Sequence, residues 1–336
     1  MRTPAGRIAA VGLVATLGMG CATTGSGAGA GGAVAAQERA LAEFDTRRAV
    51  IFDGPTGAPI TFDALADRVA SADVVLIGEI HGQPRGLACA AALFETLVGR
   101  APSSAALSLE FFDRHQQTDL DDYLSGVTDE PAFRDATGRT AENYPPGHRA
   151  MVLAALDAGV PVIAANAPRR YVRLARTDGY DRLRNLSEAQ RALFSVPDSL
   201  TGGGYRDRFY EQMAGMTGHG GPDPESADEP ETEDERAERQ AVAARLIESY
   251  YRGQNLWDAT MADSIARALS AGRRPVVQAV GRFHVEHDGG LVQRLRALAP
   301  GAEVLVVVMV DETAEAPADD DAVRDDVIVF VGEPAH

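Results

Sequence analysis

Short apolar runs alternate with longer segments of helical periodicity along most of this chain. The runs are apolar at every position and not only at every second one, which is typical of strands covered on both faces of a sheet. They predict strands at residues 49–52, 74–77, 105–109, 160–165, 276–280, 304–310 and 327–331. Apolar residues recur with helical spacing at residues 86–98, 114–124, 146–158, 238–269 and 290–298. The alternation predicts an α/β fold with a mostly parallel sheet, helices on both faces and a helical insertion.

Individual residues refine the expected helix boundaries. Thr61 precedes a helical pattern and is a typical N-cap, and Pro168 is placed to open another helix. Gly253 predicts an interruption of the long helix, because glycine is a poor helix former. Residues 220–238 are rich in Gly, Pro, Asp and Glu and lack apolar periodicity. They predict a solvated acidic loop inside one domain that spans residues 39–336.

The first 21 residues have the pattern of a bacterial export signal. Arg2 and Arg7 give a basic start, and residues 8–19 are apolar but too few to span a bilayer. A small residue before Cys21 is typical of a lipoprotein cleavage site, so we expect Cys21 to be lipidated. Residues 22–38 would then be a flexible tether to the cell envelope, at the outer membrane on its periplasmic or surface face. The alternative is a secreted or membrane-tethered protein without this lipid.

Charge narrows the classes of partner. The formal net charge of −17 argues against non-specific nucleic-acid binding and against electrostatic attraction to anionic lipid. The chain has two cysteines in different contexts, so no disulfide framework is expected. Cys89 lies in a helical pattern and is interpreted as a small core residue.

Two Gly-x-x-His turns carry the main chemical signal. Gly78-Glu79-Ile80-His81 and Gly281-Arg282-Phe283-His284 each follow directly after a predicted buried strand. Burial of a strand requires no polar group at its end, and this chain presents one twice. In an open α/β sheet, ligands bind beyond the carboxyl ends of the strands. The pattern therefore predicts one site assembled from two strand ends.

Two more predicted strands end in polar residues. Glu110 follows one of them, and Asn166 with Arg169 follows the other. Imidazole nitrogen and carboxylate oxygen are suitable ligands for zinc, manganese or iron, so His81, Glu110 and His284 are candidate metal ligands.

A metal-bound water could attack a carbonyl group, and the candidate catalytic residues are therefore Glu79, His81, Glu110 and His284. Asn166 or Arg169 could hold an oxyanion or a substrate carboxylate.

Each of these residues also has a purely structural explanation. Glu110 and Asn166 could cap the helices that follow them, and each histidine could lie at the edge of the core. His115 and His148 lie in polar helical segments, and His219 lies in a loop, so all three are weak candidates.

The ordered motifs resemble the ChaN-like haem-binding lipoproteins of the wider Tiki/TraB/erythromycin-esterase superfamily. The matching segments are residues 74–81, residues 109–113 with Gln116, Gln117 and Leu120, residues 162–170, the set Gln254, Asp258, Met261 and Ala262, and residues 281–285. The resemblance covers roughly residues 48–310 and depends on the order of the motifs. One departure is that residues 82–87 lack the further histidine that ChaN-like chains often have there.

The resemblance implies two different functions. ChaN-like lipoproteins bind haem between two subunits with tyrosine as iron ligand, which would make this protein a homodimer involved in haem uptake. Tyr144, Tyr171, Tyr205 and Tyr210 are candidate ligands, and none lies in a matching motif. Superfamily hydrolases instead use residues that match Glu79, His81, Glu110 and His284, some of them with a divalent metal.

Three hypotheses follow. The first is a lipid-anchored envelope protein that binds haem or iron. The second is a metal-dependent hydrolase of esters or amides. The third is an inactive envelope interaction module, against which the retention of all four polar strand ends counts.

Overall fold

The structure of the protein is a computed structural model that describes residues 35, 38–100, 104–140, 143–218, 232–311 and 325–332. The export signal, Cys21, nearly all of the predicted tether, His219 and most of the predicted acidic loop lie outside these residues. The division into domains therefore stays a prediction. None of the described helices combines the length and the apolar composition needed to cross a membrane.

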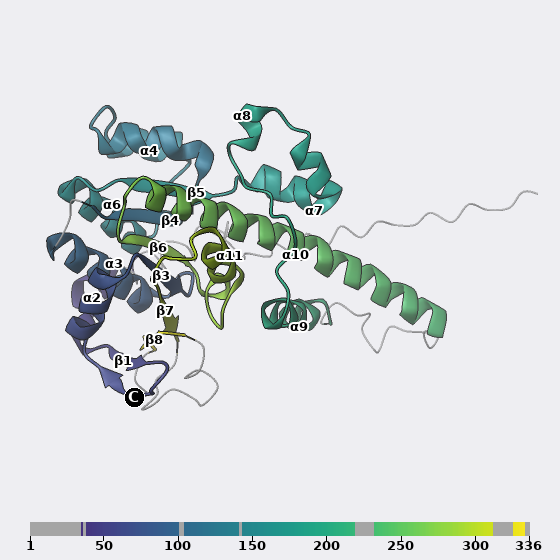
Figure 1. The fold of residues 1–336 in the computed structure, drawn as a ribbon, viewed down its shortest axis with the longest axis horizontal. Coiled ribbons are helices and arrows are strands. Elements are labelled where there is room, and N and C mark those ends of the chain that lie inside the picture. Colours follow the sequence, from purple (N-terminus) through teal and green to yellow (C-terminus); the bar gives the residue numbers. More distant parts are fainter. Residues whose placement is uncertain are drawn as a thin grey trace, which may run out of the picture.

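One sheet organises the molecule, with the strand order β2-β1-β8-β7-β3-β6-β4-β5 (Figure 1). The strands are β1 (Val50–Asp53), β2 (Pro59–Ile60), β3 (Val74–Glu79), β4 (Ala106–Asp113), β5 (Val162–Asn166), β6 (Val276–Gly281), β7 (Val304–Val310) and β8 (Val327–Phe330). Every pairing from β8 to β5 is parallel, and only β1 pairs in antiparallel fashion, with β2 and β8. The predicted α/β fold with a mostly parallel sheet is thus confirmed.

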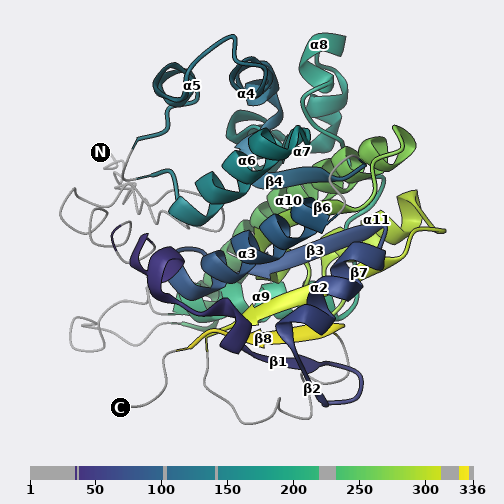
Figure 2. The ribbon, with the colours of Figure 1, turned by 90° about the vertical axis from the view of Figure 1, so that its left-hand side faces the viewer.

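Helices cover both faces of the sheet, as predicted. The longer ones are α2 (Phe62–Ser71), α3 (Pro84–Arg100), α6 (Pro146–Ala158), α7 (Arg169–Arg184), α9 (Gly204–Gly218), α10 (Glu233–Ser270) and α11 (Gly290–Leu298), and the shorter ones are α4 (Gln117–Leu124), α5 (Glu130–Ala136) and α8 (Glu188–Arg191). Figure 2 shows α3 on one side of the sheet and α10 behind it. Alternate residues of β3 divide between the two layers: Val75 and Ile77 join the core with α2, α3 and α6, whereas Val74 and Leu76 join the core with α10 and α11.

Thr61 caps α2 as predicted, since its side chain accepts a hydrogen bond from the N–H of Ala64. Two predictions about α10 were wrong. The helix begins at Glu233, inside the predicted acidic loop, because Thr232 and Glu235 form a capping box there.

The helix also runs through Gly253 without interruption. A Cβ on Gly253 would lie 3.1 Å from side-chain atoms of Arg176 and Val172, so the glycine allows close packing against α7. The three helices α7 to α9, which lie between β5 and α10, form the predicted helical insertion.

Candidate functional site

The two Gly-x-x-His turns lie side by side at the carboxyl ends of β3 and β6. These strands are parallel neighbours, and Glu79 is opposite Gly281 in their register. A Cβ on Gly78 would lie 2.7 Å from the side chain of Val285, so the first glycine allows the second turn to pack against β3. The sequence-based prediction that the two strand ends share one place is therefore correct.

The Glu79 carboxylate is held between two histidines. It is buried, and its Oε1 lies 3.1 Å from Nδ1 of His81 while its Oε2 lies 2.8 Å from Nε2 of His148. Burial alone would raise the pKa of Glu79, but the charges and hydrogen bonds of the two histidines lower it well below its ordinary value. Glu79 is therefore an ionised carboxylate in the interior.

His148, which the sequence marks only as a weak candidate, contacts Glu79 and belongs to the site. It is buried on α6, and its ring contacts Phe111 at a centroid distance of 4.9 Å. Helical periodicity marks a face of α6 as buried, but it does not tell which strand end that face meets. No local signal near Pro146-Gly147-His148 distinguishes it from a helix-surface histidine.

His81 differs from the other histidines of the site because its side chain is 36% exposed. Burial would lower its pKa, but the hydrogen bond to Glu79 and the charges of Glu110 and Glu79 raise the pKa to about 9. A Cβ on Gly281 would lie 2.8 Å from Nε2 of His81, so the ring of His81 lies directly over that glycine. The Nδ1 atom of His81 is engaged by Glu79, and Nε2 is the nitrogen left for a ligand.

Glu110 and His284 complete the group that sequence reasoning predicted. The Oε2 atom of Glu110 accepts a hydrogen bond from the N–H of Gly281 at 2.7 Å, and its Oε1 lies 3.7 Å from Nε2 of His284. Glu110 lies within β4 instead of after its end, because the strand continues to Asp113. Its role as a helix cap is therefore excluded.

His284 is positioned by residues of α10. Its Nδ1 lies 2.5 Å from Oδ1 of the fully buried Asp258, and the other oxygen of Asp258 accepts a hydrogen bond from the Tyr205 hydroxyl at 2.8 Å. The amide of Gln254 donates to the same hydroxyl at 3.0 Å. Burial would lower the pKa of His284, but Asp258 and Glu110 raise it. Gln254 and Asp258 were expected only as matching positions, although polar residues one helical turn apart in the most buried part of α10 were a usable signal.

Asn166 and Arg169 lie at the neighbouring end of β5. The side-chain oxygen of the buried Asn166 accepts a hydrogen bond from the N–H of Ala167. The residue does not cap α7, because Pro168 is at the N-cap position of that helix. Arg169 is exposed at the start of α7, and its backbone N–H donates to Asp113. Burial raises the pKa of Asp113 to about 6, although Arg139, Arg169 and Arg170 lower it. A ligand-binding role for Asn166 and Arg169 stays a prediction.

The predicted metal site is not supported by the geometry. Within the part of the chain that the structure describes, no group of three or more His, Cys, Asp or Glu side chains could hold a metal ion. The physical reason is that the donors already pair with one another. Glu110 binds the backbone of Gly281, and His284 binds Asp258, so His81 is left with only its Nε2 atom open.

Comparison with known families agrees with the resemblance stated above. A family model described as haem-binding uptake, Tiki superfamily, ChaN matches residues 65–295, which include all the site residues described here. The chain belongs to this family. No curated protein matches it.

The chain is also similar to several solved structures. ChaN of Campylobacter jejuni, solved with cofacial haem, is 16% identical with a TM-score of 0.62, and the match covers 84% of this chain and 96% of that chain. The type III effector HopBA1 is 13% identical with a TM-score of 0.39, covering 87% of this chain and 100% of that chain. An erythromycin esterase variant in its open conformation is 14% identical with a TM-score of 0.38, covering 80% and 78%. The likeness to ChaN establishes the fold, and the other two are too weak to inform function.

The four candidate tyrosines do not gather at the strand ends as open ligands. Tyr205 is buried with its hydroxyl on Asp258, and the hydroxyl of Tyr210 is bound to Glu248. Tyr144 is buried against Phe111 of β4, and Tyr171 is buried against Phe194 of the segment after α8. The resemblance therefore supplies no tyrosine that fits an iron ligand beside the two Gly-x-x-His turns.

Proposed function

We propose that this protein binds haem at the carboxyl ends of β3, β4 and β6, with Nε2 of His81 as the ligand to iron. Family membership supports haem as the ligand. The observation that carries the choice of residue is the Glu79–His81 pair, in which Nδ1 faces a buried carboxylate and the side chain reaches the surface.

This pair has the form that protein ligands to metals usually take. A ligating histidine commonly donates its second N–H to a carboxylate, which fixes the tautomer and orients the ring. Glu79 fulfils this role, and its other oxygen is held by His148 so that it cannot swing away. Imidazole is a common axial ligand of haem iron. His284 is a poorer candidate because it is buried and bound to Asp258.

Optical titration with haemin tests the proposal. We expect a saturable shift of the Soret band for the wild type and a large loss of affinity for His81→Ala. His115→Ala is a matched control, because the His115 side chain is 39% exposed, close to the 36% of His81. The proposal fails if the wild type gives no saturable shift, or if His81→Ala binds haemin as the wild type does.

We further propose that the protein acts in haem uptake at the cell envelope, held there by lipid on Cys21. The basic and apolar start of the chain supports this location. Cys21→Ser should move the protein from the membrane fraction to the soluble fraction of the cells that make it. An unchanged membrane fraction for this variant would refute the lipid anchor. A haem-bridged homodimer also stays a prediction, and light scattering with and without haemin measures it directly.

A second candidate function is hydrolysis of an ester or amide. The observation in its favour is the Asp258–His284 contact of 2.5 Å, with Glu110 3.7 Å from the other nitrogen of the ring. A histidine oriented by a buried carboxylate is a recurrent general acid or base. In this function His284 would transfer a proton to or from the reacting group, and Glu110 would accept a proton from the attacking water.

Activity assays on a panel of esters and amides separate the two functions. His81→Ala and His284→Ala should each reduce hydrolysis by about 10²-fold or more if they are catalytic. Wild-type rates in both variants would exclude the hydrolase.

A further inference from the structure

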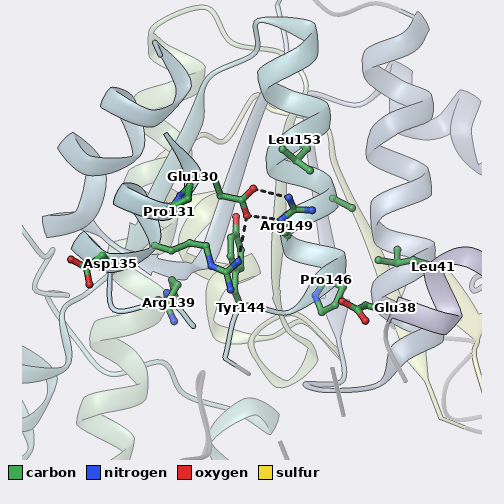
Figure 3. Close-up of a pocket in the computed structure, with 12 residues that line it drawn as sticks. Glu38, Leu41, Glu130, Pro131, Asp135, Arg139, Tyr144, Pro146, Arg149 and Leu153 are labelled. Carbon is green, nitrogen blue, oxygen red and sulfur yellow. Dashed lines mark hydrogen bonds and ion pairs between the residues drawn. The ribbon is translucent and has the colours of Figure 1, made fainter. Parts of the chain in front are cut away.

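A groove with a volume of about 780 Å³ opens between α5, α6 and the chain near Leu41 (Figure 3). This volume lies in the range of pockets that hold small molecules. Leu41, Pro131 and Leu153 are among the apolar residues that line it. The strand-end site does not include this groove, but Phe111 connects the two, because its ring stacks on Tyr144 and also contacts His148.

Tyr144 presents an unused hydrogen-bond donor in this groove. The residue is 3% exposed, and its hydroxyl has no hydrogen-bond partner within the described structure. Burial raises the pKa of Tyr144, so the hydroxyl keeps its proton at any physiological pH. Figure 3 shows the ring directed toward Glu130 and Arg149. Most buried polar groups in proteins are hydrogen-bonded, so an orphaned hydroxyl beside a cavity indicates a missing partner.

Three arginines, Arg134, Arg139 and Arg149, and three acidic residues, Glu38, Glu130 and Asp135, line the groove. Arg149 binds the Glu130 carboxylate through two hydrogen bonds of 2.6 Å, and Arg134 lies 3.8 Å from the same carboxylate. The single carboxylate of Glu130 thus pairs with two guanidinium groups. The remaining acids of the groove, Glu38 and Asp135, are exposed. A donor hydroxyl beside two guanidinium groups that share one carboxylate favours an anionic group that accepts hydrogen bonds.

We propose that the groove is a binding site for a carboxylate with an apolar body. The carboxylate accepts the hydrogen bond from Tyr144 and pairs with Arg134, while the body packs on Leu41, Pro131 and Leu153. In the free protein the buried Tyr144 hydroxyl is directed toward the ion pairs of Glu130. Such pairs near the surface contribute little to stability, so a ligand carboxylate can displace them at small cost.

Isothermal titration calorimetry with octanoate tests the proposal, with octan-1-ol as the uncharged probe of the same length. We expect saturable binding of octanoate and none of octan-1-ol at the same concentration. Tyr144→Phe keeps the stacked ring and removes only the hydroxyl, so its affinity for octanoate should fall about tenfold or more. Arg134→Gln should also weaken octanoate binding. Tyr250→Phe, on the half-exposed Tyr250 of α10, should bind octanoate like the wild type.

The free Tyr144→Phe protein should melt at the same temperature as the wild type or higher, because the lost hydroxyl had no partner to lose. A drop in affinity without a drop in stability therefore distinguishes ligand binding from a structural role. Equal octanoate affinity of Tyr144→Phe and the wild type, equal binding of octan-1-ol, or no octanoate binding at all would each overturn the proposal. Prior saturation with haemin should leave octanoate affinity unchanged, so this test is independent of the haem titration.

Discussion

Removing His148 should destabilise the protein strongly, because it leaves the Glu79 carboxylate buried with only the half-exposed His81 as partner. Glu79 and His148 are 3% and 4% exposed, and their atoms lie 2.8 Å apart. Removal of one member of a buried ion pair costs about 3–5 kcal/mol, since the other charge stays buried without compensation. We therefore expect His148→Leu to lower the free energy of unfolding by at least about 3 kcal/mol. This loss corresponds to a decrease in Tm of roughly 4–5 °C for a chain of 336 residues.

Urea unfolding followed by circular dichroism measures this loss directly. His115→Leu is the control, since a substitution of an exposed histidine should change stability by no more than about 0.5 kcal/mol. The double variant Glu79→Gln/His148→Leu should be more stable than His148→Leu alone, because the glutamine removes the buried charge. A loss below about 1 kcal/mol for His148→Leu, or no recovery in the double variant, would refute the picture of a buried carboxylate that depends on His148.

Three further predictions concern the same site. Haemin affinity should increase as the pH rises toward about 9, because His81 must lose its proton to bind iron and its pKa is raised to about 9. Haemin titrations at several pH values measure this dependence, and an affinity that does not change with pH would contradict it. Gly281→Ala should weaken haemin binding while the protein stays folded, because the new Cβ would lie 2.8 Å from Nε2 of His81. Equal haemin affinity of this variant and the wild type would contradict this prediction and show that the His81 ring can move away. The pKa of Glu79 is lowered in the folded protein, so its contribution to stability is complete above its unfolded pKa and disappears as the pH falls through its folded pKa. Glu79→Gln should therefore lose less stability than the wild type on acidification below about pH 4. Measurement of the unfolding free energy at several acidic pH values tests this.

The sheet and the central residues of the site could be predicted from the sequence. Strands covered on both faces give continuous apolar runs, and a glycine followed by a polar group marks the place where such a strand ends. Glu79, His81 and His284 could be predicted for this reason, since each lies at or just beyond a strand end near the centre of the sheet. Glu110 was predicted from the polar end of an apolar run, although β4 continues beyond it to Asp113.

The residues that position this group could not be predicted in the same way. His148 and Asp258 lie on helices. A helical pattern predicts which face of the helix is buried, but it does not predict which strand end that face contacts. Gly253 was interpreted from helix propensity as a break, but its contact with Arg176 and Val172 depends on the packing of α7, which no local pattern contains. The predicted metal site is not supported for a related reason. The sequence shows which donor side chains are present, but it does not show that they bind one another.

Electron–nuclear double resonance of the ferric haem complex tests most directly whether His81 ligates haem iron. With isotopically labelled histidine in the protein, the account predicts hyperfine coupling from one imidazole nitrogen to iron in the wild type and in His115→Ala. The same coupling should be absent in His81→Ala. Coupling that persists in His81→Ala, or wild-type protein that binds haem without any histidine coupling, would contradict the account.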